Sequence, residues 1–157
     1  LCRAGDEWLT GGIRFRILQP VTGSALQGNA LSCVLLVEAG RHRLLLSGDI
    51  EWPGEQALLA RGALLPVTVA IVPHHGSRTS SSPAFVNALQ PDLAIVSSGY
   101  QNRWGFPKED VVDRWRAAGA RVLNTAESGA ISAQICEATG LEAVGRYRLD
   151  HRRIWHE

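Results

Sequence analysis

Short apolar runs along the chain predict a series of β-strands. Residues 13–18 alternate strictly between apolar and arginine side chains, which is typical of a strand with one face in solvent. Residues 31–38 and 93–96 are apolar at nearly every position, so we expect strands that are covered on both faces. The other segments predicted as strands are 44–47, 67–72, 121–123, 130–135 and 143–149.

Three further segments have the spacing and the end signals of helices. The segment 52–61 has a proline near its start and Gly62 just after its end. Ser82 is placed to cap a helix that begins at Pro83. The segment 107–118 opens with proline and acidic residues and is followed by a glycine. Strands pair at both ends of this order and alternate with helices in the middle, which predicts an α/β fold with a mixed sheet and about three helices.

Length and composition indicate one ordinary globular domain. The chain has 157 residues, 45% of them hydrophobic and 20% charged. The formal net charge of +1 gives no sign of nucleic-acid binding. No apolar stretch approaches the ~20 residues that a membrane-spanning helix needs. The chain starts at Leu1 and contains no methionine, so we expect it to be a segment of a longer protein.

The three cysteines indicate neither a zinc site nor a disulfide framework. Cys2, Cys33 and Cys136 are odd in number and lack CxxC spacing. Cys33 and Cys136 lie in strand-like apolar runs, where cysteine usually acts as a small hydrophobic residue. The cysteines leave the redox compartment open.

Polar, metal-competent side chains follow two of the predicted strands. Residues 44–49 (LLLSGD) end in Asp49, and residues 71–82 (IVPHHGSRTSSS) carry His74 and His75 directly after an apolar run. Carboxylate and neutral imidazole are ordinary zinc ligands. The competing interpretation is a turn with two solvated histidines and an aspartate that caps the following helix.

The spacing of these two segments predicts where they meet. Asp49 and His75 are separated by 26 residues, which suits a strand, a short helix and a returning parallel strand. A right-handed crossover of this kind brings both strand ends to the same edge of the sheet. We therefore expect Asp49 and His75 to face one cleft, close enough to share a metal, with His74 turned to the cleft mouth.

The motifs in these segments resemble the metallo-β-lactamase-type domain of the ComEC family. These are polytopic inner-membrane proteins that bring transforming DNA into competent bacteria. The resemblance rests on residues 47–51 (SGDIE), on residues 72–77 (VPHHGS) and on the hydroxyl run at 79–82. Further matching segments are residues 8, 12–18, 29–37, 102–107, 116–122 and 128–130.

The resemblance implies an αββα fold and a site for two divalent metals, zinc or manganese. By analogy Asp49 bridges the metals, His75 is the last protein ligand and His74 points towards substrate phosphate. Asp49 and His74 are then the catalytic candidates. The remaining substrate-binding candidates are Ser77, Thr79 and Asn102, although hydroxyl groups before a helix serve more often as caps and turn formers.

The family's HxHxDH motif is missing. His42, His151 and His156 are isolated, so residues 1–157 are interpreted as a single-domain fragment, the C-terminal half of the metallo-β-lactamase-like domain. We expect no metal to be bound by this fragment alone, and no cleavage. Where close relatives often have GHPH, this chain has Gly105-Phe106-Pro107-Lys108. Phe106 is therefore expected to be a core or lid residue.

Two classes of function remain open from the sequence. In the first, the complete domain is a metal-dependent phosphodiesterase that degrades or processes incoming DNA, single-stranded or duplex, on the periplasmic side of the inner membrane beside a channel in the same protein. In the second, it is an inactive structural or DNA-contacting module. A hydrolase of other phosphoesters or of lactones also fits the ligands. An HxHxDH sequence upstream of Leu1 would favour hydrolysis.

Overall fold

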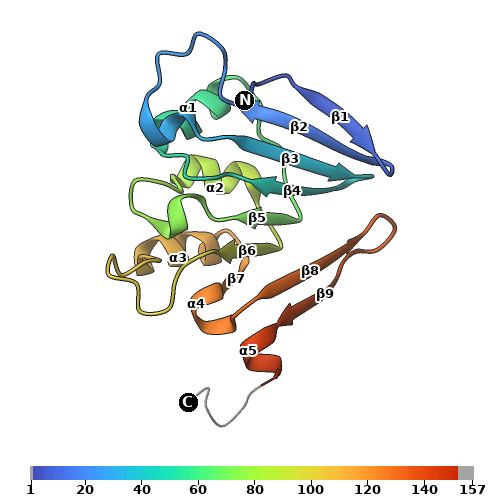
Figure 1. Ribbon diagram of the computed structural model, residues 1–157, viewed down its shortest axis with the longest axis vertical. Coiled ribbons are helices and arrows are strands. Elements are labelled where there is room, and N and C mark those ends of the chain that lie inside the picture. Colours follow the sequence, from blue (N-terminus) through green and yellow to red (C-terminus); the bar gives the residue numbers. More distant parts are fainter. Residues whose placement is uncertain (1, 152–157) are drawn as a thin grey trace.

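The structure, a computed structural model, describes residues 2–151 and is built on one seven-stranded sheet (Figure 1). His156 lies outside these residues. The strands follow one another in sequence order across the sheet. The first four are antiparallel neighbours, whereas β4 to β7 are parallel. Their bounds are β1 Glu7–Thr10, β2 Ile13–Gln19, β3 Val34–Ala39, β4 His42–Leu46, β5 Val69–Ile71, β6 Leu93–Val96 and β7 Arg121–Asn124.

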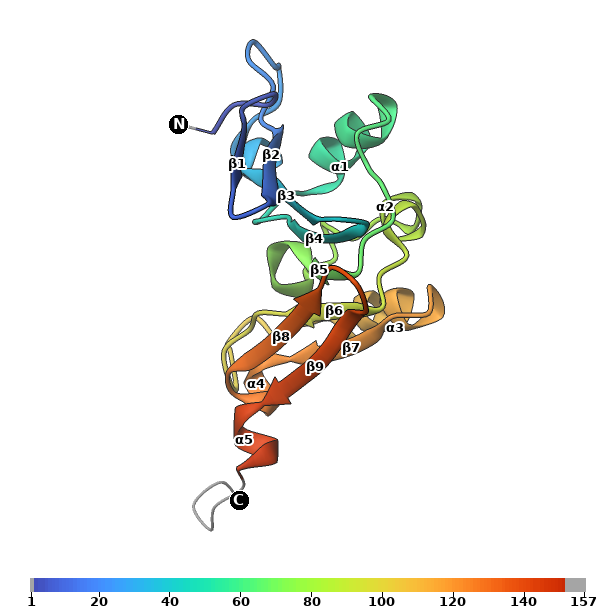
Figure 2. The same ribbon diagram turned by 90° about the vertical axis from the view of Figure 1, so that its right-hand side faces the viewer.

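Three helices cover one face of this sheet, and a hairpin lies against the other face (Figure 2). The helices are α1 Trp52–Ala60, α2 Pro83–Leu89 and α3 Glu109–Ala117. The hairpin consists of β8 Ile131–Cys136 and β9 Gly140–Arg146, which form a separate two-stranded sheet. Single turns complete the fold: 3₁₀ segments Gly28–Leu31 and Pro73–Gly76, α4 Thr125–Ser128 and α5 Tyr147–Asp150.

The main core lies between the sheet and the three helices. Phe85 of α2 and Trp115 of α3 are almost completely buried there, with their rings edge to face. A smaller core lies under the hairpin, where Val69, Leu93 and Ile95 contact its apolar side chains. Parallel strands β5 and β6 are therefore covered on both faces, which explains their continuous apolar sequence.

The predicted mixed sheet with helical cover is confirmed, and the differences are local. Besides the three expected helices, the described residues contain two four-residue α-helices, α4 and α5; the second begins at Tyr147, where a strand was expected. Residues 31–33 precede β3 instead of belonging to it. The expectation that this strand is covered on both faces was also wrong, because Leu35 and Val37 are only half-buried.

Strand β1 was not anticipated from the sequence. Its sequence, EWLT, does not alternate between apolar and polar residues, so it lacks the pattern that indicates a half-buried strand. All four residues are exposed in the structure. β1 forms because Gly11 and Gly12 turn the chain back onto β2. Its Trp8 lies opposite Phe15 in the ladder, and the two rings stack with centroids 5.1 Å apart.

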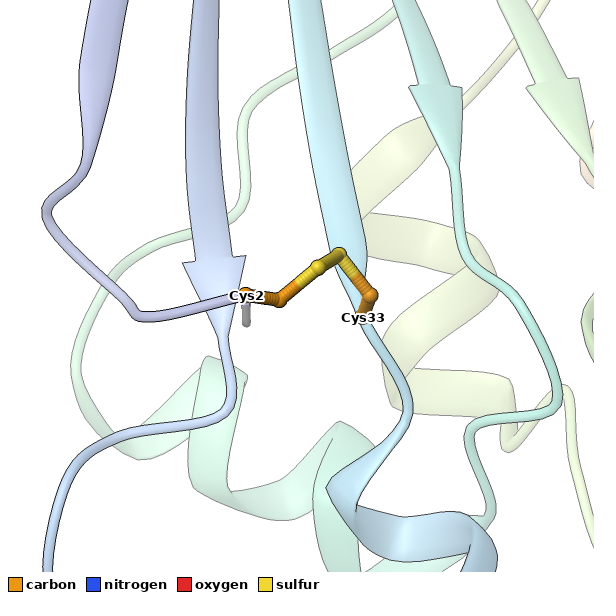
Figure 3. The surroundings of a disulfide bond; sticks show 2 residues. All are labelled: Cys2 and Cys33. Atoms are coloured by element: carbon orange, nitrogen blue, oxygen red, sulfur yellow. A yellow bond between two sulfur atoms is a disulfide. The ribbon is translucent and has the colours of Figure 1, made fainter.

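A disulfide joins Cys2 to Cys33, on the segment that leads into β3 (Figure 3). The expectation that Cys33 is a small buried hydrophobic residue was therefore wrong. The odd number of cysteines concealed the pair, because spacing alone does not say which cysteine is left over. Cys136 is the free cysteine of the described residues and is half-buried. The disulfide ties the start of the chain to the antiparallel part of the sheet.

Replacing both Cys2 and Cys33 with serine should lower the free energy of unfolding by about 3–4 kcal/mol. The bond closes a loop with a sequence separation of 31 residues, and opening it restores that loop's freedom to the unfolded chain. Urea unfolding followed by circular dichroism measures the change. Cys136→Ser serves as the control, and equal transition midpoints for the double variant and the unaltered chain would contradict the prediction.

Candidate metal and phosphate site

Two loops meet where β4 and β5 end. The strands are parallel neighbours, with Leu44 opposite Val69 in the ladder, and α1 forms the crossover between them. Beyond the last ladder pair, the Ser47 hydroxyl donates to the Ile71 carbonyl at 2.6 Å. The His74 amide donates to the Gly48 carbonyl at 3.1 Å. These bonds fix the Asp49 loop (residues 47–51) against the histidine loop (residues 72–77).

Asp49 and His75 face each other across this junction. The distance from His75 Nε2 to Asp49 Oδ1 is 3.7 Å, and each side chain is about half exposed, 48% for His75 and 46% for Asp49. His75 Nδ1 lies 2.6 Å from the Ser97 carbonyl, which can only accept, so Nδ1 carries the proton. In the neutral ring the lone pair of Nε2 then faces Asp49. The expected common edge for these two residues is confirmed.

The histidine loop holds three successive residues in the left-handed region. The φ angles are 50° at His74, 56° at His75 and 81° at Gly76. Such angles are unfavourable for residues with a side chain, at about 1–3 kcal/mol each. Gly76 is also required sterically, because a Cβ there would lie 2.5 Å from Cβ of Pro107. The loop therefore keeps a costly shape that turns both histidines out of the strand direction.

His74 pairs with Glu51. Its Nδ1 lies 3.3 Å from Glu51 Oε1 and 3.2 Å from Thr79 Oγ1. The Thr79 hydroxyl itself donates to Glu51 Oε1 at 2.9 Å. The His74 side chain is only 22% exposed, less than half the value for His75. The sequence argument did not include this pairing with Glu51, two residues after Asp49.

The hydroxyl run stabilises the loop more than it presents donors to solvent. Ser77 is buried, and its Oγ accepts from the Thr79 amide at 3.3 Å. The Ser80 hydroxyl donates to the Pro73 carbonyl at 2.9 Å. Ser82 caps α2 as expected, because its Oγ accepts from the Phe85 amide. Of the two hydroxyl candidates, Thr79 is exposed beside His74, whereas Ser77 serves the turn.

A buried carboxylate anchors the end of this run. Glu55 on α1 has no exposed surface, and its carboxylate accepts from the backbone amides of Ser81 and Ser82. Burial raises the pKa of Glu55 above its ordinary value, although these amide donors and the charge of Arg114 oppose the rise. On the other side of the loop, Trp115 Nε1 donates to Ser81 Oγ at 3.1 Å. Sequence reasoning missed Glu55, because a glutamate on a short helix usually indicates a solvated face.

A pocket of about 360 Å³ opens beside His75. Its walls include the loop after β6 and the aromatic rings of Trp104 and Phe106. Asn102 lies in the same wall, but its amide holds the loop: Nδ2 donates to the Phe106 carbonyl at 2.7 Å, and Oδ1 accepts from the Phe106 amide at 2.9 Å. Asn102 thus shapes the pocket with both ends of its side chain engaged. Phe106 is half-buried and forms part of the wall.

The donors at this edge fit part of a metal site. Asp49 supplies a carboxylate and His75 a ring nitrogen whose tautomer is set by a backbone carbonyl, as is usual for metal-binding histidines. Within residues 2–151, no group of three His, Cys, Asp or Glu side chains gathers at one point. Asp49 is not the cap of α1, since Glu51 occupies that position and makes no side-chain capping bond. The interpretation of Asp49 as a helix cap was therefore wrong.

Comparison with known proteins agrees with this geometry. The profile of the metallo-β-lactamase superfamily matches residues 23–100, which include both loops. The chain is 42% identical over 129 residues to competence protein ComA of Neisseria gonorrhoeae. It is 42% identical over 130 residues to recombination protein 2 of Haemophilus influenzae and 33% identical over 129 residues to ComE operon protein 3 of Bacillus subtilis.

These matches cover most of this chain and a small part of each relative. They span 82–83% of the chain, but only 16–19% of the length of the three relatives. Among the residues that the structure describes, no helix is long and apolar enough to cross a membrane.

The Glu55→Gln variant should change how stability depends on pH. A glutamate with its ordinary pKa of 4.5 ionises first in the unfolded chain, while burial keeps the folded Glu55 protonated to higher pH. The protonated form contributes its full stabilisation below about pH 4.5. This contribution is lost as pH rises through the raised pKa of folded Glu55. Glutamine does not titrate, so the variant should lack this decline.

Urea unfolding between about pH 4 and pH 7 measures the difference. At low pH the variant should be the less stable protein, because the glutamine NH₂ group replaces one of the two oxygens that each accept from a backbone amide. The difference in free energy of unfolding between the two proteins should then become smaller as pH rises. Parallel pH profiles for the two proteins would contradict the prediction.

Proposed function

The chain belongs to the ComEC family of competence proteins and has a metallo-β-lactamase-type fold, and from this we propose that it forms part of a metal-dependent phosphodiesterase that acts on DNA during uptake. The DNA is degraded or processed as it enters the cell. The relatives are named for competence and recombination, which supports DNA as the substrate class.

The observation that carries the proposal is the pairing of Asp49 with His75. A carboxylate and a tautomerically fixed imidazole stand 3.7 Å apart at the edge where parallel strands end. Open α/β sheets bind their ligands at this edge. Two different ligand types at this distance suit a divalent metal such as zinc or manganese.

A divalent metal at this site would supply Lewis-acid chemistry, namely a more acidic bound water and positive charge opposite the charge that develops on phosphate. Asp49 and His75 would hold that metal, and the Ser97 carbonyl keeps the His75 ring in orientation. The His74 Nδ1–H donates to Thr79 Oγ1, because the Thr79 hydroxyl uses its own proton to donate to Glu51. In its protonated form His74 has a second N–H, at Nε2, for a phosphate oxygen. Thr79 keeps Glu51 and His74 together.

We further propose that residues 1–157 are the second half of the catalytic domain. The first half, with its HxHxDH ligands, would precede Leu1 in the longer protein, because a catalytic zinc normally has three protein ligands and this chain offers two. The partners in that protein would be a membrane channel and the DNA strand that passes it. The alternative is an inactive module that contacts DNA, and the test below separates the two.

The disulfide supports a place on the periplasmic side of the inner membrane. Disulfides such as Cys2–Cys33 persist in oxidising compartments and are rare in the cytosol. A DNA-processing domain on that side would meet the strand before it crosses the membrane. Labelling of the free Cys136 by a thiol reagent that does not cross membranes reports the side directly.

The complete domain, with the upstream half included, should cleave a labelled oligonucleotide when zinc or manganese is present. Asp49→Ala should lower the rate at least about a hundredfold, because the metal supplies several kcal/mol of transition-state stabilisation. Asp113→Ala is the matched control, since Asp113 is an exposed carboxylate on α3 whose one ion pair among residues 2–151 is with Arg116. Gel analysis of the products measures the rates.

Residues 1–157 alone should bind zinc or manganese weakly in calorimetry and cleave no DNA. Chelator-sensitive cleavage by this chain alone would show that half of the site is not missing. A complete domain that binds DNA and never cleaves it would favour the inactive module.

A further inference from the structure

The loop after β6 presents aromatic rings beside His75. We call residues 99–108 the aromatic loop. Trp104 is 58% exposed, and its ring is nearly parallel to that of Phe106, at 12° with centroids 6.5 Å apart. Both rings line the pocket that His75 also lines. A tryptophan that served only the packing of this loop would not leave more than half of its surface in solvent.

Positive charges accompany the rings of this surface. The Arg103 guanidinium carbon lies 4.4 Å from the centroid of the Trp104 ring, and the Lys108 ammonium lies 5.3 Å from that of Phe106. Across the loop, Arg148 lies over Tyr100, which is 70% exposed. The combination of flat apolar faces and cations suits a ligand that carries both an aromatic ring and a negative charge.

Hydrogen bonds hold the aromatic loop in one shape. Lys108 Nζ donates to the Trp104 carbonyl at 2.6 Å, and the Lys108 amide donates to the Gly76 carbonyl at 2.9 Å. The second bond connects the loop directly to the histidine loop. Together with the Asn102 side chain, these bonds set the rings before any ligand arrives. Binding then costs little conformational entropy in this loop.

We propose that the aromatic loop binds a nucleobase of a single-stranded nucleic acid, with Trp104 as the stacking residue. This inference rests on the proposed function, because it places a base next to the phosphate that Asp49 and His75 would act on. Bases in a duplex are stacked on each other and offer no free face, whereas a single strand does. The loop therefore selects single strands over duplex, and it does so by the base and not by the phosphate.

The test is binding of this chain to labelled oligothymidylate of about 12 nucleotides, a length typical of single-strand sites. The assay contains a chelator, so binding does not depend on the metal. Trp104→Ala should weaken binding about 5- to 150-fold, which corresponds to the loss of one base–aromatic stack. Trp104→Phe should retain most of the affinity.

Two controls separate stacking from charge and from misfolding. An abasic strand of the same length carries the phosphates without the bases, so it should bind weakly and equally to the unaltered chain and to Trp104→Ala. Trp8→Ala removes another exposed tryptophan, on β1 at the opposite edge of the sheet, and should leave oligothymidylate binding unchanged. Circular dichroism verifies that each variant is folded.

The outcomes distinguish this inference from the proposed function. Equal affinity for the abasic strand, unchanged binding by Trp104→Ala, or no binding of the single strand overturns the base site, whatever the complete domain cleaves. Base-dependent binding by a complete domain that never cleaves DNA upholds the base site and overturns hydrolysis.

Discussion

The parallel pairing of β4 with β5 is the constraint on which the site depends. The ladder has two registered pairs, Leu44 with Val69 and Leu45 with Ala70. Beyond it, a serine hydroxyl and one backbone amide continue the contact into the loops. A shift of one residue would turn every side chain of the strand to the opposite face and separate Asp49 from His75. The apolar cover on both faces of β5 is what prevents that shift.

Buried hydrogen bonds support the loops of the candidate site. Glu55, Ser81 and Trp115 form a buried polar network that joins α1, the hydroxyl run and α3. Burial in a low-dielectric interior strengthens each of these bonds and makes any missing partner expensive. The network sets where the chain runs between His75 and α2. Most of the hydroxyl groups near the histidines therefore hold the loop, and few of them are left to contact a ligand.

The sequence predicted the features that follow from strand ends and helix signals. Asp49 and His75 could be placed together because a right-handed crossover has one outcome for two parallel strands. Contacts between side chains could not be obtained in this way. His74 turns to Glu51, Cys2 pairs with Cys33, and a buried glutamate binds a loop 26 residues away. Each of these depends on the three-dimensional path of a loop, about which hydrophobic periodicity carries no information.

The left-handed backbone of His74 and His75 sets the conformational cost of these positions against the need to keep their imidazole side chains. Glycine adopts the backbone angles of His74 and His75 without steric cost, so a redesign aimed only at thermal robustness would choose it at both positions. Such a protein would relieve the backbone cost but would lose the imidazoles and their bonds to Thr79 and to the Ser97 carbonyl. Stability-guided engineering of this scaffold must therefore keep both positions fixed and seek its gains elsewhere in the fold.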